Sequence, residues 1–165
     1  MYINMDQPNF DLEKFKNLLE RARTFYQELS EIFCPALSAK ISFNSDGFHH
    51  LRFDGTRAER SKQEQSNKLR CLKTAVEILK ITTTIQEYRK TVQPFGKTGR
   101  DGFKKTSEVE YWGFIAIIRD IRMKVIVRKI GNGSPHFWSV MPFWVRVNGA
   151  DASIKAFATN KIENE

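Results

Sequence analysis

The fold is decided by the stretch Ile121-Arg-Met-Lys-Val-Ile-Val-Arg-Lys-Ile130, which is followed by Gly131-Asn-Gly-Ser134 and then by His136-Phe-Trp-Ser-Val-Met-Pro-Phe-Trp144. Apolar and basic residues alternate in the first run, and a period of two is typical of a strand with one buried face. Asn-Gly between two such runs is a strong hairpin signal, because both central turn residues accept a positive φ. We therefore predict an antiparallel hairpin.

A two-residue loop, Asn132-Gly133, would set the register of this hairpin. The predicted cross-strand pairs are Val127 with Trp138, Val125 with Val140 and Ile126 with Ser139. This register joins two apolar sets into one core surface, because cross-strand partners share a face. It places Lys124, Arg128 and Ser139 on the opposite face. Pro135 donates no ladder hydrogen bond, so a longer loop is the alternative.

The bulk composition is that of one globular domain. The chain has 165 residues, of which 41% are hydrophobic and 28% are charged, enough for a real core. No apolar run approaches a membrane span and the N-terminus has no signal-peptide pattern, so we expect a cytoplasmic protein with no membrane partner. Cys34 and Cys71 are expected to be reduced thiols.

The charge of the chain indicates its kind of partner. The net charge is +8 and the pI is about 9.6, which favours a polyanion, most commonly nucleic acid. A merely basic domain, or one neutralised by an acidic protein, is the alternative. The sequence has no CxxC, Cys/His cluster, HExxH, GxSxG, dinucleotide fingerprint or paired carboxylates at motif spacing. We therefore expect neither a metal nor a cofactor.

Helical periodicity occupies the N-terminal half. One long amphipathic helix is predicted from Asp11, a plausible N-cap, to about Cys34. A second is predicted over about 57–80 after Thr56; its polar first half is either an exposed helix or a mobile loop. A third, short helix is predicted over 85–92. The glycine-rich basic segment 95–103 is a loop that lacks the spacing of a phosphate-binding loop.

The remaining patterns predict strands. Residues 48–53 alternate, which would put His49, Leu51 and Phe53 on the buried side of a strand and turn His50 and Arg52 away from the core. A loop or the start of a helix is the alternative, and this assignment would then fail. The apolar run 109–118 is either a buried strand or a short helix, and its composition favours a strand. We predict an α+β fold in a single domain, 1–165. Helices at about 10–92 would pack on a C-terminal antiparallel meander of three to five strands at about 108–147, and 148–165 would be a polar tail.

Two constellations could act on a phosphate. Lys124 and Arg128 near the Ser139 hydroxyl would neutralise phosphate charge and stabilise an expanding phosphorane. His50, with Arg52 and Arg57, could move a proton near neutral pH. The alternatives are a solvated polar sheet face for the first group and an exposed surface histidine for the second.

Two further sets of residues would bind nucleic acid rather than react with it. His136, before Phe137 and Trp138, could move a proton or stack on a base, or it could simply pack at the end of the hairpin. The basic set around the second helix would clamp a nucleic-acid backbone, or it would be a salt-bridged solvent face that includes Glu59 and Glu64. The residues assigned to nucleic-acid binding are Arg52, Arg57, Arg60, Lys62, Arg122 and His136.

The predicted order is helices first and then an antiparallel meander, whose last strands read Arg-Met-Lys-Val-Ile-Val-Arg and Phe-Trp-Ser-Val-Met-Pro. This order resembles the barnase–EndoU–colicin–RelE ribonuclease superfamily, especially its phage-borne and toxin-like branches. The resemblance covers about 41–147; the basic helix and the long first helix are not signatures of the family. In the resemblance, His50 matches the histidine ahead of the long helix, Lys124 or Arg128 the basic strand residue, and Ser139 the Ser/Thr of a closing strand.

What the resemblance implies is a metal-independent endoribonuclease, acting as a toxin or defence effector. The expected mechanism is attack of the RNA 2′-OH on the adjacent phosphate, with His50 as base or acid, Arg128 and Lys124 on phosphate oxygens and Ser139 holding substrate. RNA is the expected partner, with an antitoxin or immunity protein as a second one. The alternative is a non-catalytic nucleic-acid- or protein-binding accessory protein of a phage or mobile element.

Overall fold

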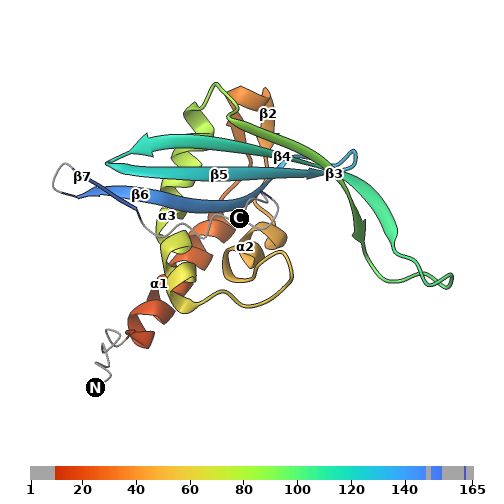
Figure 1. Ribbon diagram of the computed structural model, residues 1–165, viewed down its shortest axis with the longest axis horizontal. Helices are drawn as coiled ribbons and strands as arrows, with labels where there is room; N and C mark the ends of the chain where they lie inside the picture. The colour runs from red at the N-terminus through yellow and green to blue at the C-terminus, as the bar shows by residue number, and fades with distance from the viewer. Residues whose placement is uncertain (1–9, 148–149, 154–161, 163–165) are drawn as a thin grey trace, which may run out of the picture.

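The computed structural model describes residues 10–147, 150–153 and 162, and it has helices in the N-terminal half and an antiparallel sheet in the C-terminal half (Figure 1). The helices are α1 (Leu12–Glu28), α2 (Ser45–Arg52) and α3 (Lys62–Ile81). Between α1 and α2 lie β1 (Ile32–Cys34), the 3-10 turn η1 (Pro35–Leu37) and β2 (Ala39–Ile41). The main sheet contains β3 (Glu87–Phe95), β4 (Lys105–Ile118), β5 (Ile121–Ile130), β6 (His136–Val147) and β7 (Ala150–Ser153), paired in that order. This meander confirms the predicted α+β class.

Polar side chains mark where the helices begin. The Asp11 carboxylate accepts a hydrogen bond from the Lys14 backbone at 3.0 Å, so α1 has the predicted N-cap. Helix α3 begins after Ser61, which forms a capping box with Glu64. The predicted start at Thr56 was therefore wrong, and the segment before Ser61 is a loop.

Helix α2 corrects the predicted strand over 48–53. The Asn44 side chain accepts a hydrogen bond from the Gly47 backbone at 3.1 Å and caps the helix. On a helix, residues three and four apart share a face, and Gly47, His50 and Leu51 form the buried face of α2. His50 is only 2% exposed; the prediction that it points away from the core was wrong.

Strand β3 replaces the third predicted helix. It pairs with β4 along its whole length, from Glu87 opposite Gly113 to Phe95 opposite Lys105. Most of its side chains are exposed, so no core pattern in its own sequence could reveal the strand. The apolar run 109–118 lies within β4, as its composition predicted.

The main sheet has five strands, within the predicted three to five, but it takes in more of the chain than predicted. It begins at Glu87 rather than near residue 108, and β7 adds Ala150–Ser153 to the region predicted as a polar tail. Ile162 is buried beside Val109 and Tyr111. The rest of the predicted tail lies outside the described residues.

The hairpin that motivated the fold has the predicted register over part of its length. Val125 pairs with Val140 and Ile126 with Ser139, but Val127 pairs with Phe137. A register shift between Ile126 and Val127 makes Trp138 an extra residue on β6. The bulge turns Trp138 away from the predicted core surface and into a second cluster with Val109, Tyr111 and Ile126.

The two faces of the sheet therefore differ. The main core joins α1, α3 and the β1–β2 pair to one sheet face, which supplies Phe114, Val125, Val127, Phe137 and Val140. The other face carries Tyr111, Arg128 and Trp138. Helices α2 and α3 both pack against β6, so some of their side chains reach this second face.

Two further expectations concern the cysteines and the membrane. Cys34 and Cys71 are buried, free thiols, and burial raises the pKa of Cys71 to about 11. Within the described part of the chain, no helix has the length and apolar character needed to cross a membrane.

Candidate nucleic-acid cleft

A cleft of about 690 Å³ opens on the second sheet face. The loop that follows α2 lines it, and so do the end of β3, Gly96 and Lys104. The floor is formed by side chains from α2 and the sheet. The lining residues are Asp46, His49, His50, Asp54, Gly55, Thr56, Arg57, Gln93, Pro94, Phe95, Gly96, Lys104, Tyr111, Arg128 and Trp138.

Trp138 lies between two nitrogen-bearing side chains. The His50 ring is stacked on the indole with centroids 3.9 Å apart and an interplanar angle of 16°. The Arg128 guanidinium carbon lies 3.5 Å from the indole centroid. Two groups this close cannot share one face of the ring, so they occupy opposite faces. The bulge in β6 thus brings together a histidine of the helical layer and an arginine of the sheet.

Arg128 is held in place by three elements. Its Nε donates to His136 Nε2 at 3.0 Å, and a terminal nitrogen lies 3.5 Å from the Asp46 carboxylate. Tyr111 is its cross-strand neighbour on β4. Burial lowers the pKa of Arg128, but an arginine keeps its charge at neutral pH. The result is a fixed cation at the floor of the cleft.

His136 orients this cation. Burial, followed by the charge of Arg128, lowers the pKa of His136 to about 4. The ring is therefore neutral near pH 7, and Nε2 accepts the proton of Arg128 Nε. His136 does not line the cleft, so its geometry matches packing at the hairpin end better than a second proton-transfer role.

His50 is held by Arg60, which lies in the loop just before α3. Arg60 Nε donates to the His50 carbonyl oxygen at 3.2 Å, and a terminal Arg60 nitrogen lies 3.3 Å from His50 Nε2. Since arginine can only donate, Nε2 is the acceptor in this contact. Arg60 is thus a buried positioning group rather than the surface clamp that its sequence context predicted.

Ser139 and Lys124 lie outside the cleft. Lys68 Nζ donates to the Ser139 hydroxyl at 3.0 Å and to the Val140 carbonyl at 3.1 Å, and Ser139 has no exposed surface. Lys124 pairs with Glu87 across the sheet. It is four residues along β5 from Arg128, about 13 Å at the rise of a strand. The predicted trio shares a sheet face, but only Arg128 lines the cavity.

The other predicted cations fall into two groups. Arg57 is exposed, has a left-handed φ of 68° and lines the cleft. Arg52 contacts Gln65 and Glu59, and Lys62 also pairs with Glu59, so these two match the salt-bridged alternative. Arg122 is half-buried near the far end of β5 and does not line the cleft.

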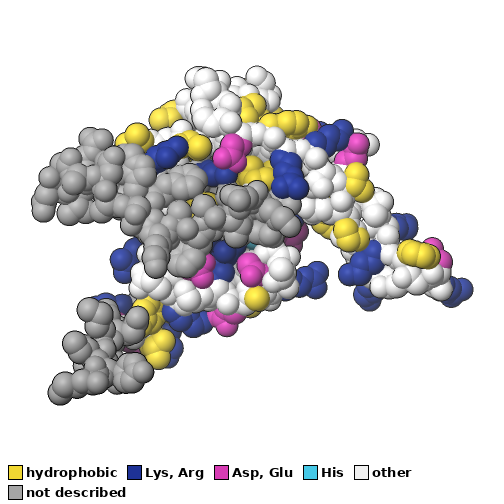
Figure 2. Space-filling view, in the orientation of Figure 1, with side chains coloured by type: hydrophobic (Ala, Val, Ile, Leu, Met, Phe, Trp, Pro, Cys, Tyr) yellow, Lys and Arg dark blue, Asp and Glu magenta, His cyan; other side chains and the backbone are white. Residues whose placement is uncertain are grey.

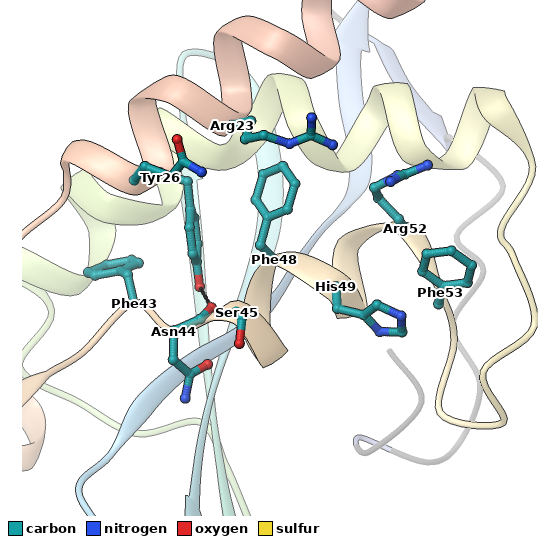
Figure 3. A pocket seen from close by; sticks show the side chains of 10 residues that line it. Arg23, Tyr26, Phe43, Asn44, Ser45, Phe48, His49, Arg52 and Phe53 are labelled. Carbon is teal, nitrogen blue, oxygen red and sulfur yellow. Dashed lines mark hydrogen bonds between the residues drawn. The ribbon is translucent and has the colours of Figure 1, made fainter.

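A second, smaller pocket lies between α1 and α2 (Figure 3). Its volume is about 310 Å³, and the rings of Tyr26, Phe43, Phe48 and Phe53 line it together with Arg23 and Arg52. The Tyr26 hydroxyl donates to the Asn44 carbonyl at 2.7 Å and fixes one wall. His49 lines both this pocket and the cleft.

Sequence reasoning missed several residues of the cleft. His49 was placed on the inner side of a strand, but on α2 it is exposed and stacked on Phe53 with centroids 4.3 Å apart. Trp138 was assigned to the core because an extra residue in a strand leaves no mark in the alternation. Tyr111 was visible only as part of an apolar run. The one available signal was the His-His pair itself.

Comparisons with known proteins give no functional information about this chain, so the function is inferred from the geometry of the cleft. No protein-family model, curated protein or solved structure matches the chain. Among the described residues, no group of three or more His, Cys, Asp or Glu side chains is placed to hold a metal ion.

Proposed function

We propose that this protein is a metal-independent endoribonuclease whose active site is the cleft on the second sheet face. The observation that carries the proposal is the joint position of His50 and Arg128 on opposite faces of Trp138, at the floor of one cavity. A proton-transfer group and a fixed cation are the two requirements for displacement at a phosphate whose nucleophile is already in the substrate.

The reaction would proceed through the RNA 2′-OH. Its oxygen attacks the adjacent phosphorus, one histidine of the His49–His50 pair takes its proton, and the other protonates the departing 5′-oxygen as the P–O5′ bond breaks. Arg128 stabilises the charge that develops on the phosphorane oxygens. Ser139 and Lys124 have no direct role in this scheme, because neither lines the cleft.

Three features support RNA over a small phosphate ester. The cleft is rimmed by Arg57 and Lys104, which suit flanking phosphates. The adjoining pocket has an aromatic lining and two arginines, the surface on which proteins stack unpaired bases. The net charge of +8 favours a long polyanion.

The experiment is a comparison of single-turnover cleavage by the wild type and by His49→Gln, His50→Gln and Arg128→Lys. Each histidine change should slow cleavage by roughly 10²–10⁴, the usual contribution of a positioned acid or base. Since His50 and Arg128 are buried, thermal melting must accompany the rates. Arg57→Gln, at an exposed cleft residue, gives a variant expected to stay folded with weaker RNA binding; Arg21→Gln on α1 is its matched control.

The second candidate is an RNA-binding module without catalysis. The contact of Arg60 with His50 Nε2 favours it, because this contact engages a nitrogen that a base would use. In that case all variants would leave RNA intact, while Arg57→Gln would still weaken binding.

A further inference from the structure

The hairpin of β3 and β4 extends beyond the rest of the sheet (Figure 1). Strand β5 pairs with β4 only from Val109 onward. Val92 pairs with Glu108, and among the strands that the structure describes none lies beside the pairs further out. We call residues 92–108 the arm and residues 96–105 its tip. A two-stranded ribbon without a third strand is marginally stable by itself. The arm therefore contributes little to the stability of the core, and a binding role would account for it instead.

The tip of the arm is basic and carries exposed apolar side chains. Residues 96–105 contain four basic residues and one acidic residue. Phe103 in the tip is 75% exposed, and Val92 at the inner end of the arm is 63% exposed. In the space-filling view, Lys and Arg side chains gather on the arm with hydrophobic ones between them (Figure 2).

The acidic side chains of the arm are used within the hairpin. The Asp101 carboxylate accepts a hydrogen bond from the Phe103 backbone at 3.1 Å, and Glu108 pairs with Lys90 at 3.0 Å. The Gly99 backbone also donates to the Phe103 carbonyl at 2.7 Å, so the tip has a defined shape. The basic side chains of the tip form no ion pair with any residue that the structure describes; these are Lys97, Arg100, Lys104 and Lys105.

The root of the arm is also a wall of the cleft. Gln93, Pro94 and Phe95 at the root line it, as do Gly96 and Lys104 at the inner end of the tip; the loop of Arg57 lines the same cleft. A polymer bound in the cleft and leaving on this side would therefore run along the arm toward Phe103. A small substrate in the cleft would not reach Lys97, Arg100 or Phe103, which do not line it.

We propose that the arm binds the RNA strand that flanks the cleaved linkage, with Lys97 and Arg100 on its phosphates and Phe103 under one of its bases. This inference rests on the proposed function for the direction of the strand. Cations placed around an exposed aromatic ring form the usual surface for single-stranded nucleic acid. An acidic protein would satisfy the cations, but it would not explain why the root of the arm is continuous with the cleft.

The test uses the full chain with Lys97→Ala, Arg100→Ala and Phe103→Ala combined. A second variant, Lys16→Ala with Lys80→Ala, removes equal charge from exposed positions on α1 and α3. Binding is measured with a 20-nucleotide RNA carrying 2′-deoxy sugars, which cannot be cleaved, and catalysis with a dinucleoside monophosphate. We expect the tip variant to bind the long strand at least tenfold more weakly. Its salt slope should fall by about 1.4, the value for two lost single-strand phosphate contacts.

The tip variant should cleave the dinucleotide at the wild-type rate, and the control variant should match the wild type in both assays. RNA binding that is unchanged in the tip variant would overturn the proposal, as would a wild type without RNA affinity. Retention of polyglutamate in place of RNA would assign the arm to an acidic protein and overturn it too. If the wild type binds the long strand through the arm but cleaves nothing, the arm stands and the proposed function fails.

Discussion

At the scale of single residues, the cleft depends on buried polar side chains that hold one another. Arg128 donates a hydrogen bond to His136 Nε2 and lies 3.5 Å from the Asp46 carboxylate, and its guanidinium group covers one face of Trp138. Arg60 does the same for His50 through a carbonyl and a ring nitrogen. Removing one partner leaves another buried polar group unsatisfied, which costs more than the hydrogen bond itself contributes.

Arg128→Ala should therefore destabilise the fold by roughly 2–4 kcal/mol, because it orphans His136 and opens a void against Trp138. Urea denaturation would measure the loss. Arg21→Ala, on the exposed face of α1, is the control and should change stability by less than about 0.5 kcal/mol. A loss for Arg128→Ala no larger than that of the control would show that the buried network contributes nothing.

His136 predicts a dependence of stability on pH. Its pKa is about 4 in the folded protein and about 6.5 when unfolded, so the unfolded state binds more protons between these values. Stability should fall as the pH is lowered from about 6.5 to 4, by about 3 kcal/mol from this residue. His136→Gln keeps an acceptor for Arg128 but cannot titrate. The wild-type minus variant difference in unfolding free energy should follow this slope, and a flat difference would contradict the pKa of His136.

At the scale of elements, the β6 bulge and helix α2 position the site. The bulge rotates Trp138 onto the second face, and α2 brings the histidine pair to it. Helix α2 can approach β6 closely only because residue 47 is glycine: a Cβ there would lie 2.2 Å from the Phe137 carbonyl oxygen.

Gly47→Ala should thus push α2 from the sheet and destabilise the protein by about 1–3 kcal/mol. It should also reduce RNA cleavage, since His50 moves with the helix. Ser45→Ala, at an exposed position in the same helix, is the control and should preserve both properties. Thermal unfolding and single-turnover rates together would check this, and a stable, fully active Gly47→Ala would refute the close-approach argument.

The elements also show which features can be predicted from the sequence. The register was predicted correctly around Val125 and Ile126, because the alternation fixes which residues of a strand share a face. It was wrong next to the turn: Arg128 pairs with His136, so the loop is longer than Asn132-Gly133, as the alternative raised by Pro135 allowed. Helix α2 was missed because Leu51 and Phe53 are two residues apart and fit a strand, whereas only Phe48 and Leu51 have helical spacing. Strand β3 was missed because pairing with β4, rather than burial of its own side chains, makes it a strand.

At the scale of the whole molecule, one sheet face makes the core and the other makes the cleft. The candidate site was predicted only in part: His50, Arg128, Arg57, Arg60 and His136 were named, whereas Trp138 and Tyr111, which lie between or beside them, were not assigned to it. Alternation separates the faces of a strand, yet it cannot show that Trp138 changes face or that Lys68 reaches Ser139 across 71 positions of sequence. Those contacts are tertiary, and no local pattern records them.

The most direct test of metal-independent RNA cleavage is to incubate the purified protein with a defined RNA in excess EDTA and to determine the fragment ends. We predict cleavage without added metal, 5′ fragments that end in a cyclic or 3′-phosphate, and no cleavage of a strand with a 2′-deoxy sugar at the cut site, because the 2′-OH is the nucleophile. Intact RNA under saturating binding, or cleavage that requires Mg²⁺, would contradict the proposed function.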